Sequence, residues 1–436
     1  MKYHIWTEGC QMNVADSDRL ARALGTLGLE TTVDASQAQM IILNTCVVRQ
    51  SAEDRALGRL NSLRPLKRQN PDLIIGLMGC LVGIKGNAAM EKRYPWVDIF
   101  AAPSDPEPFL RFLSNRVDQG ESEIWRAQVD DVLDAEFGVT TEARHTVSEN
   151  LPIVLGCSHA CAYCVIPGRR GKEQSRQPEK ILAEARVMVE HGAKELVLLG
   201  QIVDRYGLDL ENGMLLPQLL AELSEIEGLE RIRFLTSHPN WMTNDLIDAV
   251  ARLPKVMPHI EVPVQAGDND ILHAMRRGYS NQDYRDLIAQ IRERIPGVSI
   301  GTDVIVGFPG ESESAFEQTF KLLEDLKLDV AHLARYSPRP NTYSAKFLPD
   351  DVSAEEKMRR FRALEELQKE VVGEINQKFL GKKQPVLFEG KSKDRWRGRT
   401  PTNRLVFVES SENLIGQTRD VHINWTGPWS LLGEVD

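Results

Sequence analysis

The sequence predicts a multidomain α/β protein in three parts: an amino-terminal parallel-sheet α/β domain, a central partial (β/α)6 barrel and a small antiparallel β-barrel at the carboxyl end. Strand-like and helix-like stretches alternate in two separate regions, which favours parallel sheets covered by helices. After residue 380, short strand-like runs are instead broken by glycine and proline, as is typical of small barrels. A chain of 436 residues holds about three domains. We place them at residues 1–116, 143–372 and 373–436, with an acidic linker at 117–142.

Composition narrows the class of protein. A hydrophobic fraction of 42% and a charged fraction of 27% are ordinary for globular proteins. No run of about 18 apolar residues occurs, and the first residues lack the apolar core of a signal peptide. We therefore expect a cytoplasmic protein with no membrane partner. The net charge of −10 argues against a nucleic-acid partner, so the distribution of charge has to be considered as well.

The amino-terminal region places one cysteine after each of three predicted strands. The strands are expected at Lys2–Thr7, Met40–Asn44 and Asp72–Met78, and the helices at Val14–Leu27 and Ser51–Leu63, the latter with Ser51 as its N-cap. Cys10, Cys46 and Cys80 follow the strands in that order. Open α/β sheets bind ligands at the carboxyl ends of their strands, so we expect the three thiols to converge. The alternative is that Cys46 and Cys80 are buried as small hydrophobic residues.

Residues 117–150 have a different composition. Nine acidic residues stand against two basic ones, without a sustained apolar period. We interpret this stretch as a connection between domains that carries much of the negative charge.

The central region repeats a strand and a helix six times. Strands are expected near residues 152–156, 195–200, 230–236, 259–264, 299–306 and 329–335. Helices are expected at Pro178–His191, Leu215–Ile226, Asn244–Leu253, Asn281–Ile295 and Glu313–Leu326. Such repeats predict a partial barrel with its site at the carboxyl ends of the strands. A long amphipathic helix at Glu355–Phe379 is expected to pack against this barrel.

A three-cysteine motif ends the first strand of that barrel. Cys157, Cys161 and Cys164 lie on one short loop. Four cysteines hold an ordinary 4Fe–4S cluster, so three would leave one iron open to an outside ligand. The alternatives are a zinc site completed by His159 and a set of unrelated core cysteines. A large chain without a signal peptide favours metal-binding or catalytic thiols over disulfides.

The carboxyl-terminal tail contains a positively charged stretch, although the whole chain is negatively charged. Residues 382–404 hold eight basic residues and two acidic ones, a local net charge of +6. A basic patch of this kind is typical of a nucleic-acid contact, and an aromatic residue within it could stack on a base. The candidates are Lys391, Lys393, Arg395, Trp396, Arg397, Arg399 and Arg404. The alternative is a solvated basic face.

These motifs resemble a known family over nearly the full length of the chain. The spacing of Cys157, Cys161 and Cys164 is similar to that of the radical S-adenosylmethionine (SAM) enzymes, and the settings of the other three cysteines resemble their methylthiotransferase branch. Gln11-Met12-Asn13 resembles the form that modifies adenosine in tRNA, and the tail resembles the RNA-binding TRAM domain.

The resemblance implies two 4Fe–4S clusters and SAM as cofactors. Cys157, Cys161 and Cys164 would hold the radical SAM cluster, whereas Cys10, Cys46 and Cys80 would hold an auxiliary cluster. Further residues are expected to contact SAM, with Ile305 and Gly307 letting the backbone approach the adenine: Tyr163, Gly200, Gln201, Ile305 and Gly307.

The implied reaction adds a methylthio group to carbon 2 of N(6)-isopentenyladenosine at position 37 of tRNA, with two SAM consumed per product. The expected partners are the anticodon stem-loop of tRNA and an electron donor such as flavodoxin or ferredoxin, and we expect a monomer. Three alternatives stay open: the threonylcarbamoyladenosine branch, the branch that modifies an aspartate of a ribosomal protein, and a non-catalytic iron–sulfur protein that binds RNA. Ser158-His159-Ala160 and Ile202 depart from the commoner family residues, which leaves local loop contacts and the choice of substrate open.

Overall fold

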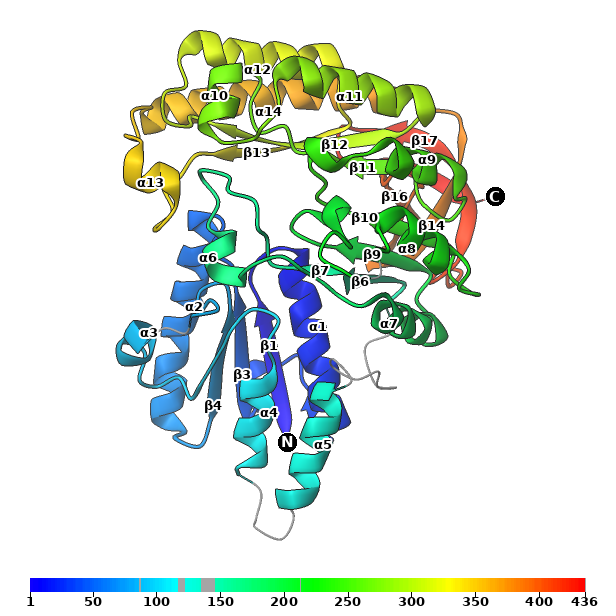
Figure 1. Cartoon of the computed structure of the whole chain (residues 1–436). Coiled ribbons are helices and arrows are strands. Elements are labelled where there is room, and N and C mark those ends of the chain that lie inside the picture. The colour runs from blue at the N-terminus through cyan, green and yellow to red at the C-terminus, as the bar shows by residue number, and fades with distance from the viewer. Residues whose placement is uncertain (86–87, 117–121, 135–145, 212, 436) are drawn as a thin grey trace. The chain divides into compact units, whose positions relative to one another are not determined.

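The computed structural model describes residues 1–85, 88–116, 122–134, 146–211 and 213–435 (Figure 1). The chain divides into two compact units. Unit 1 comprises Met1–Arg144, Val154–His159 and Cys164–Arg176, and unit 2 comprises His145–Ile153, Ala160–Tyr163 and Gln177–Asp436. Across the described ranges, every helix is too short or too polar to span a bilayer.

Unit 1 is built on a five-stranded parallel sheet in the order β2-β1-β3-β4-β5. Its strands are β1 (Lys2–Thr7), β2 (Glu30–Thr31), β3 (Met40–Thr45), β4 (Ile74–Gly79) and β5 (Ile99–Ala101). Its longer helices are α1 (Gln11–Thr26), α2 (Gln50–Gln69), α3 (Ala88–Arg93), α4 (Glu107–Ser114) and α5 (Ser122–Asp134). The side chains of β3 and β4 are buried throughout, as expected for central strands of a sheet that is covered on both faces. The predicted parallel-sheet domain is confirmed.

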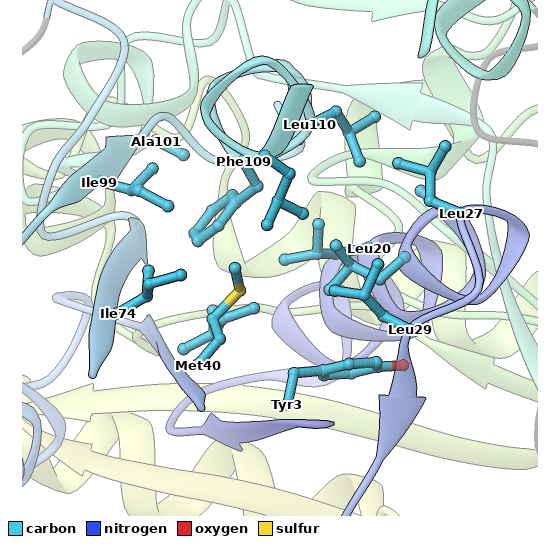
Figure 2. Close-up of a cluster of buried hydrophobic side chains, with 14 of the residues drawn as sticks. Tyr3, Leu20, Leu27, Leu29, Met40, Ile74, Ile99, Ala101, Phe109 and Leu110 are labelled. Carbon is cyan, nitrogen blue, oxygen red and sulfur yellow. The ribbon is translucent and has the colours of Figure 1, made fainter. Parts of the chain in front are cut away.

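Two hydrophobic clusters cover the two faces of this sheet. The cluster in Figure 2 packs Leu20 of α1 and Phe109 of α4 onto Met40 and Ile74 of the sheet. The second cluster packs Leu60 and other residues of α2 against the opposite face. These layers fix the strand ends that carry the three amino-terminal cysteines.

The expected linker contains a helix. Helix α5 lies within residues 117–142 and buries Val129 and Val132 in the first hydrophobic cluster, with Trp125 partly buried beside them. Its apolar residues recur every three or four positions, but acidic residues fill the positions between them and obscured the pattern. The remainder of the expected linker lies outside the described residues. The expected N-cap at Ser51 is also wrong, because α2 begins at Gln50 and is capped by Arg49 without a side-chain hydrogen bond.

Unit 2 contains the six parallel strands of the predicted partial barrel. They form two three-stranded sheets, β10-β9-β6 and β11-β12-β13. The strands are β6 (Ser148–Pro152), β9 (Glu195–Leu199), β10 (Arg231–Phe234), β11 (His259–Glu261), β12 (Ser299–Val306) and β13 (Val330–Arg335). The helices are α7 (Pro178–Glu190), α8 (Leu216–Ser224), α9 (Asn244–Arg252), α10 (Asn269–Ala274), α11 (Asn281–Arg294), α12 (Glu313–Leu326), α13 (Tyr343–Phe347) and α14 (Ala354–Gln377).

The first predicted barrel strand is displaced in the structure. Strand β6 ends at Pro152, whereas the next residues form β7 (Val154–Leu155). Strand β7 pairs with β8 (Gln174–Ser175) in a separate two-stranded sheet of unit 1. The apolar run at residues 151–155 crosses from the end of β6 into β7 and had suggested one strand there.

The carboxyl end of unit 2 is a closed barrel in the order β14-β15-β16-β18-β17. Its strands are β14 (Lys383–Ser392), β15 (Arg395–Arg399), β16 (Leu405–Val408), β17 (Thr418–Thr426) and β18 (Leu431–Val435). The pairing of β16 with β18 is parallel, so the predicted small barrel is present but is not antiparallel throughout. Helix α14 continues through the expected domain boundary at 372/373.

A buried arginine joins the two barrels of unit 2. Arg233 of β10 donates to Glu195 at 2.8 Å, and both side chains are 2% exposed. The same guanidinium donates to the carbonyl oxygens of Thr400 and Pro401, each at 2.8 Å, in the carboxyl-terminal barrel.

We expect Arg233→Ala to lower the free energy of unfolding by about 3–5 kcal/mol, because it leaves the buried Glu195 charge without its partner. Urea denaturation measures the change. Arg285→Ala is the control: its ion pair with Asp325 is more exposed, and such pairs contribute about 0–1 kcal/mol. Equal losses in the two variants would contradict the structural role of Arg233.

Candidate metal centre and cofactor site

The three amino-terminal cysteines lie at one edge of the unit 1 sheet. Cys10 is the N-cap of α1, and Cys46 and Cys80 each follow directly on a strand. The strands are in register there, with Thr7 beside Asn44 and Thr45 beside Gly79. Gly79 has φ +94°, and a Cβ at this position would lie 2.5 Å from the Thr45 carbonyl oxygen, so the turn into Cys80 requires glycine.

The first two thiols contact each other directly. The hydrogen bond between the side chains of Cys10 and Cys46 lowers the pKa of Cys10 to about 6 and raises that of Cys46. Burial raises the pKa of Cys80, which lies close enough to both thiols to affect them electrostatically. The lowered pKa of Cys10 favours its thiolate, which is the metal-binding form of cysteine.

Two buried asparagines hold the loop that carries Cys10. The side-chain oxygen of Asn13 accepts from the backbone N–H and the thiol of Cys10, both at 3.3 Å. The Asn13 amide donates to Asn44 and to the carbonyl oxygen of Thr45, both at 3.0 Å, while Asn44 donates to Ser17 at 2.9 Å. Sequence reasoning noted Asn13 only as part of a motif and gave Asn44 no role. The available signals were an amide three residues after Cys10 and a polar side chain near the end of a buried strand.

The donor set of this site consists of thiols, which are ligands of iron–sulfur clusters. The cysteines supply sulfur alone, and none of these three forms a disulfide. Across the described residues, no group of three or more His, Cys, Asp or Glu side chains is arranged to hold one ion. Thiolates are also the ligands of 4Fe–4S clusters, and three of them would leave one iron open. That these three cysteines hold such a cluster stays a prediction.

The cysteines of the second motif belong to different units: Cys157 and Cys164 to unit 1, and Cys161 to unit 2. In unit 1, Cys157 is buried, its sulfur accepts from the His159 N–H at 3.4 Å, and its own N–H donates to the Gly171 carbonyl oxygen at 3.1 Å. In unit 2, Cys161 accepts from the buried Arg277 at 3.3 Å. That these cysteines bind a cluster with Cys164 stays a prediction.

Four of the expected SAM contacts lie at or just beyond strand ends of unit 2. Gly200 and Gln201 follow β9, whereas Ile305 lies in β12 and Gly307 follows it. A Cβ at Gly307 would collide with the side chain of Lys357 on α14. This glycine therefore lets α14 approach the loop, and its expected contact with SAM stays a prediction.

The fifth expected contact, Tyr163, packs in a hydrophobic cluster of unit 2. Its ring meets that of Phe308 edge-on, with centroids 6.5 Å apart. Phe308 in turn meets Tyr336 at 5.2 Å. This packing fixes the residue that directly precedes Cys164.

The basic patch of the tail divides into exposed and structural residues. Four of its members are exposed: Lys391, Lys393, Arg395 and Arg397. Arg399 is half-buried and pairs with Glu389 at 3.4 Å. Arg404 pairs with Asp329 at 2.5 Å and donates to Asn376 at 2.9 Å, so it anchors the small barrel within unit 2.

The expected stacking of Trp396 on a base is wrong. This side chain lies in the core of the small barrel, its indole N–H donates to the Ser410 carbonyl oxygen at 3.2 Å, and Lys391 covers the ring. The exposed tryptophans are instead Trp425, at 49%, and Trp429, at 64%. Both lie outside the basic stretch, so no pattern in the sequence singled them out.

Three family models match successive parts of the chain. They are described as "Uncharacterized protein family UPF0004", at residues 2–102, "Radical SAM superfamily", at 151–323, and "TRAM domain", at 377–435. Among solved structures, the radical SAM methyltransferase TsrM from Kitasatospora setae superposes with a TM-score of 0.55 at 12% identity, covering 79% of this chain and 77% of that one. That likeness concerns the fold.

Two curated relatives match almost from end to end. Both are named tRNA-2-methylthio-N(6)-dimethylallyladenosine synthase. The protein from Roseiflexus sp. (strain RS-1) is 46% identical over 99% of this chain and 89% of its own length. The protein from Dehalococcoides mccartyi (strain CBDB1) is 44% identical over 99% of this chain and 98% of its own.

The three-cysteine loop, the parallel strands of unit 2 and the matched models define the class: radical SAM proteins that end in a TRAM domain. Within that class, the chain belongs to the family of the tRNA-2-methylthio-N(6)-dimethylallyladenosine synthases. Membership of the radical SAM superfamily implies a 4Fe–4S cluster and SAM as cofactors.

Proposed function

We propose that this protein is a tRNA methylthiotransferase that adds a methylthio group to carbon 2 of N(6)-isopentenyladenosine 37 in the anticodon stem-loop. The observation that carries the proposal is the position of Cys10, Cys46 and Cys80 after three neighbouring parallel strands, at one sheet edge, in a chain that also has the radical SAM triad. The first three would hold an auxiliary cluster, and Cys157, Cys161 and Cys164 would hold the radical SAM cluster.

The two cysteine sets would have different roles in the reaction. When bound, the two clusters and SAM would supply the sulfur, the methyl group and the radical chemistry at carbon 2. Asn13 and Asn44 keep the Cys10 loop in place. Arg277 donates to Cys161 and to the Pro263 carbonyl oxygen, and so holds this thiol against unit 2. Reducing equivalents would come from flavodoxin or ferredoxin, and the protein would act as a monomer.

The tRNA would be bound through the exposed cations of the small barrel. Lys391, Lys393, Arg395 and Arg397 can each face a phosphate, because charge attraction to the backbone does not require a fixed pocket. Trp429 and Trp425 replace Trp396 as the residues that would stack on unpaired bases.

The reaction is tested on tRNA that carries isopentenyladenosine but lacks the methylthio group. Anaerobic, cluster-replete protein with SAM and a reductant should yield the methylthio nucleoside, detected by mass spectrometry of the digested tRNA. Two parallel reactions offer threonylcarbamoyladenosine tRNA and ribosomal protein instead. A product on either of these, with none on the isopentenylated tRNA, would contradict the proposed substrate.

Changing the four exposed cations to glutamine should weaken tRNA binding mainly at low salt. The slope of log affinity against log salt is negative, and each lost phosphate contact makes it shallower by about 0.7–0.9. Loss of four contacts should therefore make the slope less negative by about 3. Filter binding over a salt series measures it. The matched control neutralises four cations on the helices of unit 2, Arg285, Lys321, Lys327 and Lys369, and should leave the slope unchanged. A loss of affinity that is independent of salt would indicate a misfolded barrel instead.

A further inference from the structure

Unit 1 places a buried arginine beside the amino-terminal thiols. Arg170 ends α6 (Ile166–Arg170), the short helix that follows Cys164. Its side chain is 3% exposed and pairs at 2.8 Å with Asp16 of α1, whose side chain is 0% exposed. A buried ion pair is costly to desolvate, so its position calls for an explanation beyond stability.

The hydrogen bonds of Arg170 involve its two terminal nitrogens and leave the Nε–H without a partner among the described residues. One terminal nitrogen donates to Asp16, and the other donates to the Ser104 hydroxyl at 3.2 Å. The Ser104 hydroxyl in turn donates to Asp16 at 2.6 Å, which fixes the orientation of the carboxylate. The Nε–H of Arg170 is buried and has no hydrogen-bond partner among the described residues. A buried donor without an acceptor is unfavourable, so this N–H points to a group that the protein itself does not supply.

The thiols are the neighbours of this guanidinium. Its partner Asp16 lies on α1, whose N-cap is Cys10, and the adjacent Arg169 donates to the carbonyl oxygen of Leu81, the residue after Cys80, at 3.4 Å. Both thiols and Asp16 raise the pKa of Arg170 against the effect of burial, so the cation is permanent.

We propose that Arg170 is a positioning residue of the auxiliary cluster, and this inference rests on the proposed function. Asp16 and Ser104 hold its guanidinium, and its Nε–H donates to a sulfur of the group bound by Cys10, Cys46 and Cys80. Hydrogen bonds to cluster sulfurs and nearby charge are among the determinants of reduction potential. A fixed cation stabilises the form that has gained an electron, so Arg170 raises the reduction potential of this cluster.

The sign of the effect separates this role from a purely structural one. Arg170→Gln removes a positive charge near the cluster and should lower the potential. Asp16→Asn removes a negative charge from the same ion pair and should raise it. If the pair only clamps α6 to α1, breaking it from either side should have the same consequence.

The experiment uses the full chain with Cys157, Cys161 and Cys164 all changed to Ala, so that any bound cluster is the auxiliary one. Iron content is measured first, and the potential is then titrated by electron paramagnetic resonance. Arg170→Gln should lower the potential by about 59 mV or more, which is a tenfold change in the one-electron equilibrium. The control Arg111→Gln, in an exposed pair with Glu107, should leave it unchanged.

The possible outcomes are distinguishable. Opposite shifts for Arg170→Gln and Asp16→Asn support the role of Arg170; shifts in the same direction, or none with full iron content, overturn it. If Arg170→Gln does not fold, Asp16→Asn decides alone: a higher potential supports the inference and a lower one overturns it. If the triple variant with Arg170 intact binds no iron, the proposed auxiliary cluster itself is wrong, and the inference falls with it.

Discussion

Cys161→Ala should abolish reductive cleavage of SAM, whereas Cys46→Ala should leave that cleavage intact and still stop methylthiolation. The two thiols belong to different sets: Cys161 accepts from Arg277 in unit 2, and Cys46 follows β3 at the edge of the unit 1 sheet. Losing one of three ligands removes the cluster that the set holds, because the open iron already lacks a protein ligand. Chromatography of 5′-deoxyadenosine reports on the first reaction, and mass spectrometry of digested tRNA reports on the second.

The contrast between the variants is more informative than either loss alone. Ala162→Ser, next to Cys161 but not a ligand candidate, serves as a control for disturbance of the loop, since its side chain is buried with Phe308 and Met275. Full product formation by Cys46→Ala would show that Cys10, Cys46 and Cys80 are ordinary buried cysteines. Loss of SAM cleavage in Cys46→Ala would show that the two sets do not act independently.

The convergence of the amino-terminal thiols could be predicted from topology alone. Consecutive parallel strands end at the same sheet edge, and one cysteine follows each of β1, β3 and β4. Strand bounds at Lys2–Thr7 and Ser299–Val306 agree with the prediction, and each strand is followed by a polar residue or glycine, Glu8 and Gly307. In such regions the local pattern and the tertiary burial point the same way.

Long-range polar contacts could not be predicted in this way. Asp16 and Arg170 are separated by 154 positions, and nothing in either local sequence marks them as partners. Arg233 and Thr400 are 167 positions apart, and the contact uses a backbone carbonyl oxygen, which has no sequence signature at all. Only the fold brings these groups together.

The error at Trp396 has a local cause. Residues Arg395-Trp396-Arg397-Gly398-Arg399 alternate between exposed and more buried positions, so they form the strand β15 with the tryptophan on its inner face. The positive charge of the segment favoured a nucleic-acid contact for all its residues, although the period of two places Trp396 on the buried face. A basic strand of a small barrel presents its cations on one face and its core residues on the other, and the two roles have to be separated before residues are assigned.

Iron analysis should give about eight irons per chain after anaerobic reconstitution, falling to about four when Cys157, Cys161 and Cys164 are all changed to Ala. The physical reason is that Cys10, Cys46 and Cys80 converge without help from the second motif, through a sheet edge, a glycine turn and the amides of Asn13 and Asn44. The reciprocal triple variant, with Cys10, Cys46 and Cys80 changed to Ala, should also retain about four, since each set holds one cluster. Four irons falling to none in the first variant would leave a single-cluster radical enzyme, for which transfer of sulfur from an auxiliary cluster is excluded.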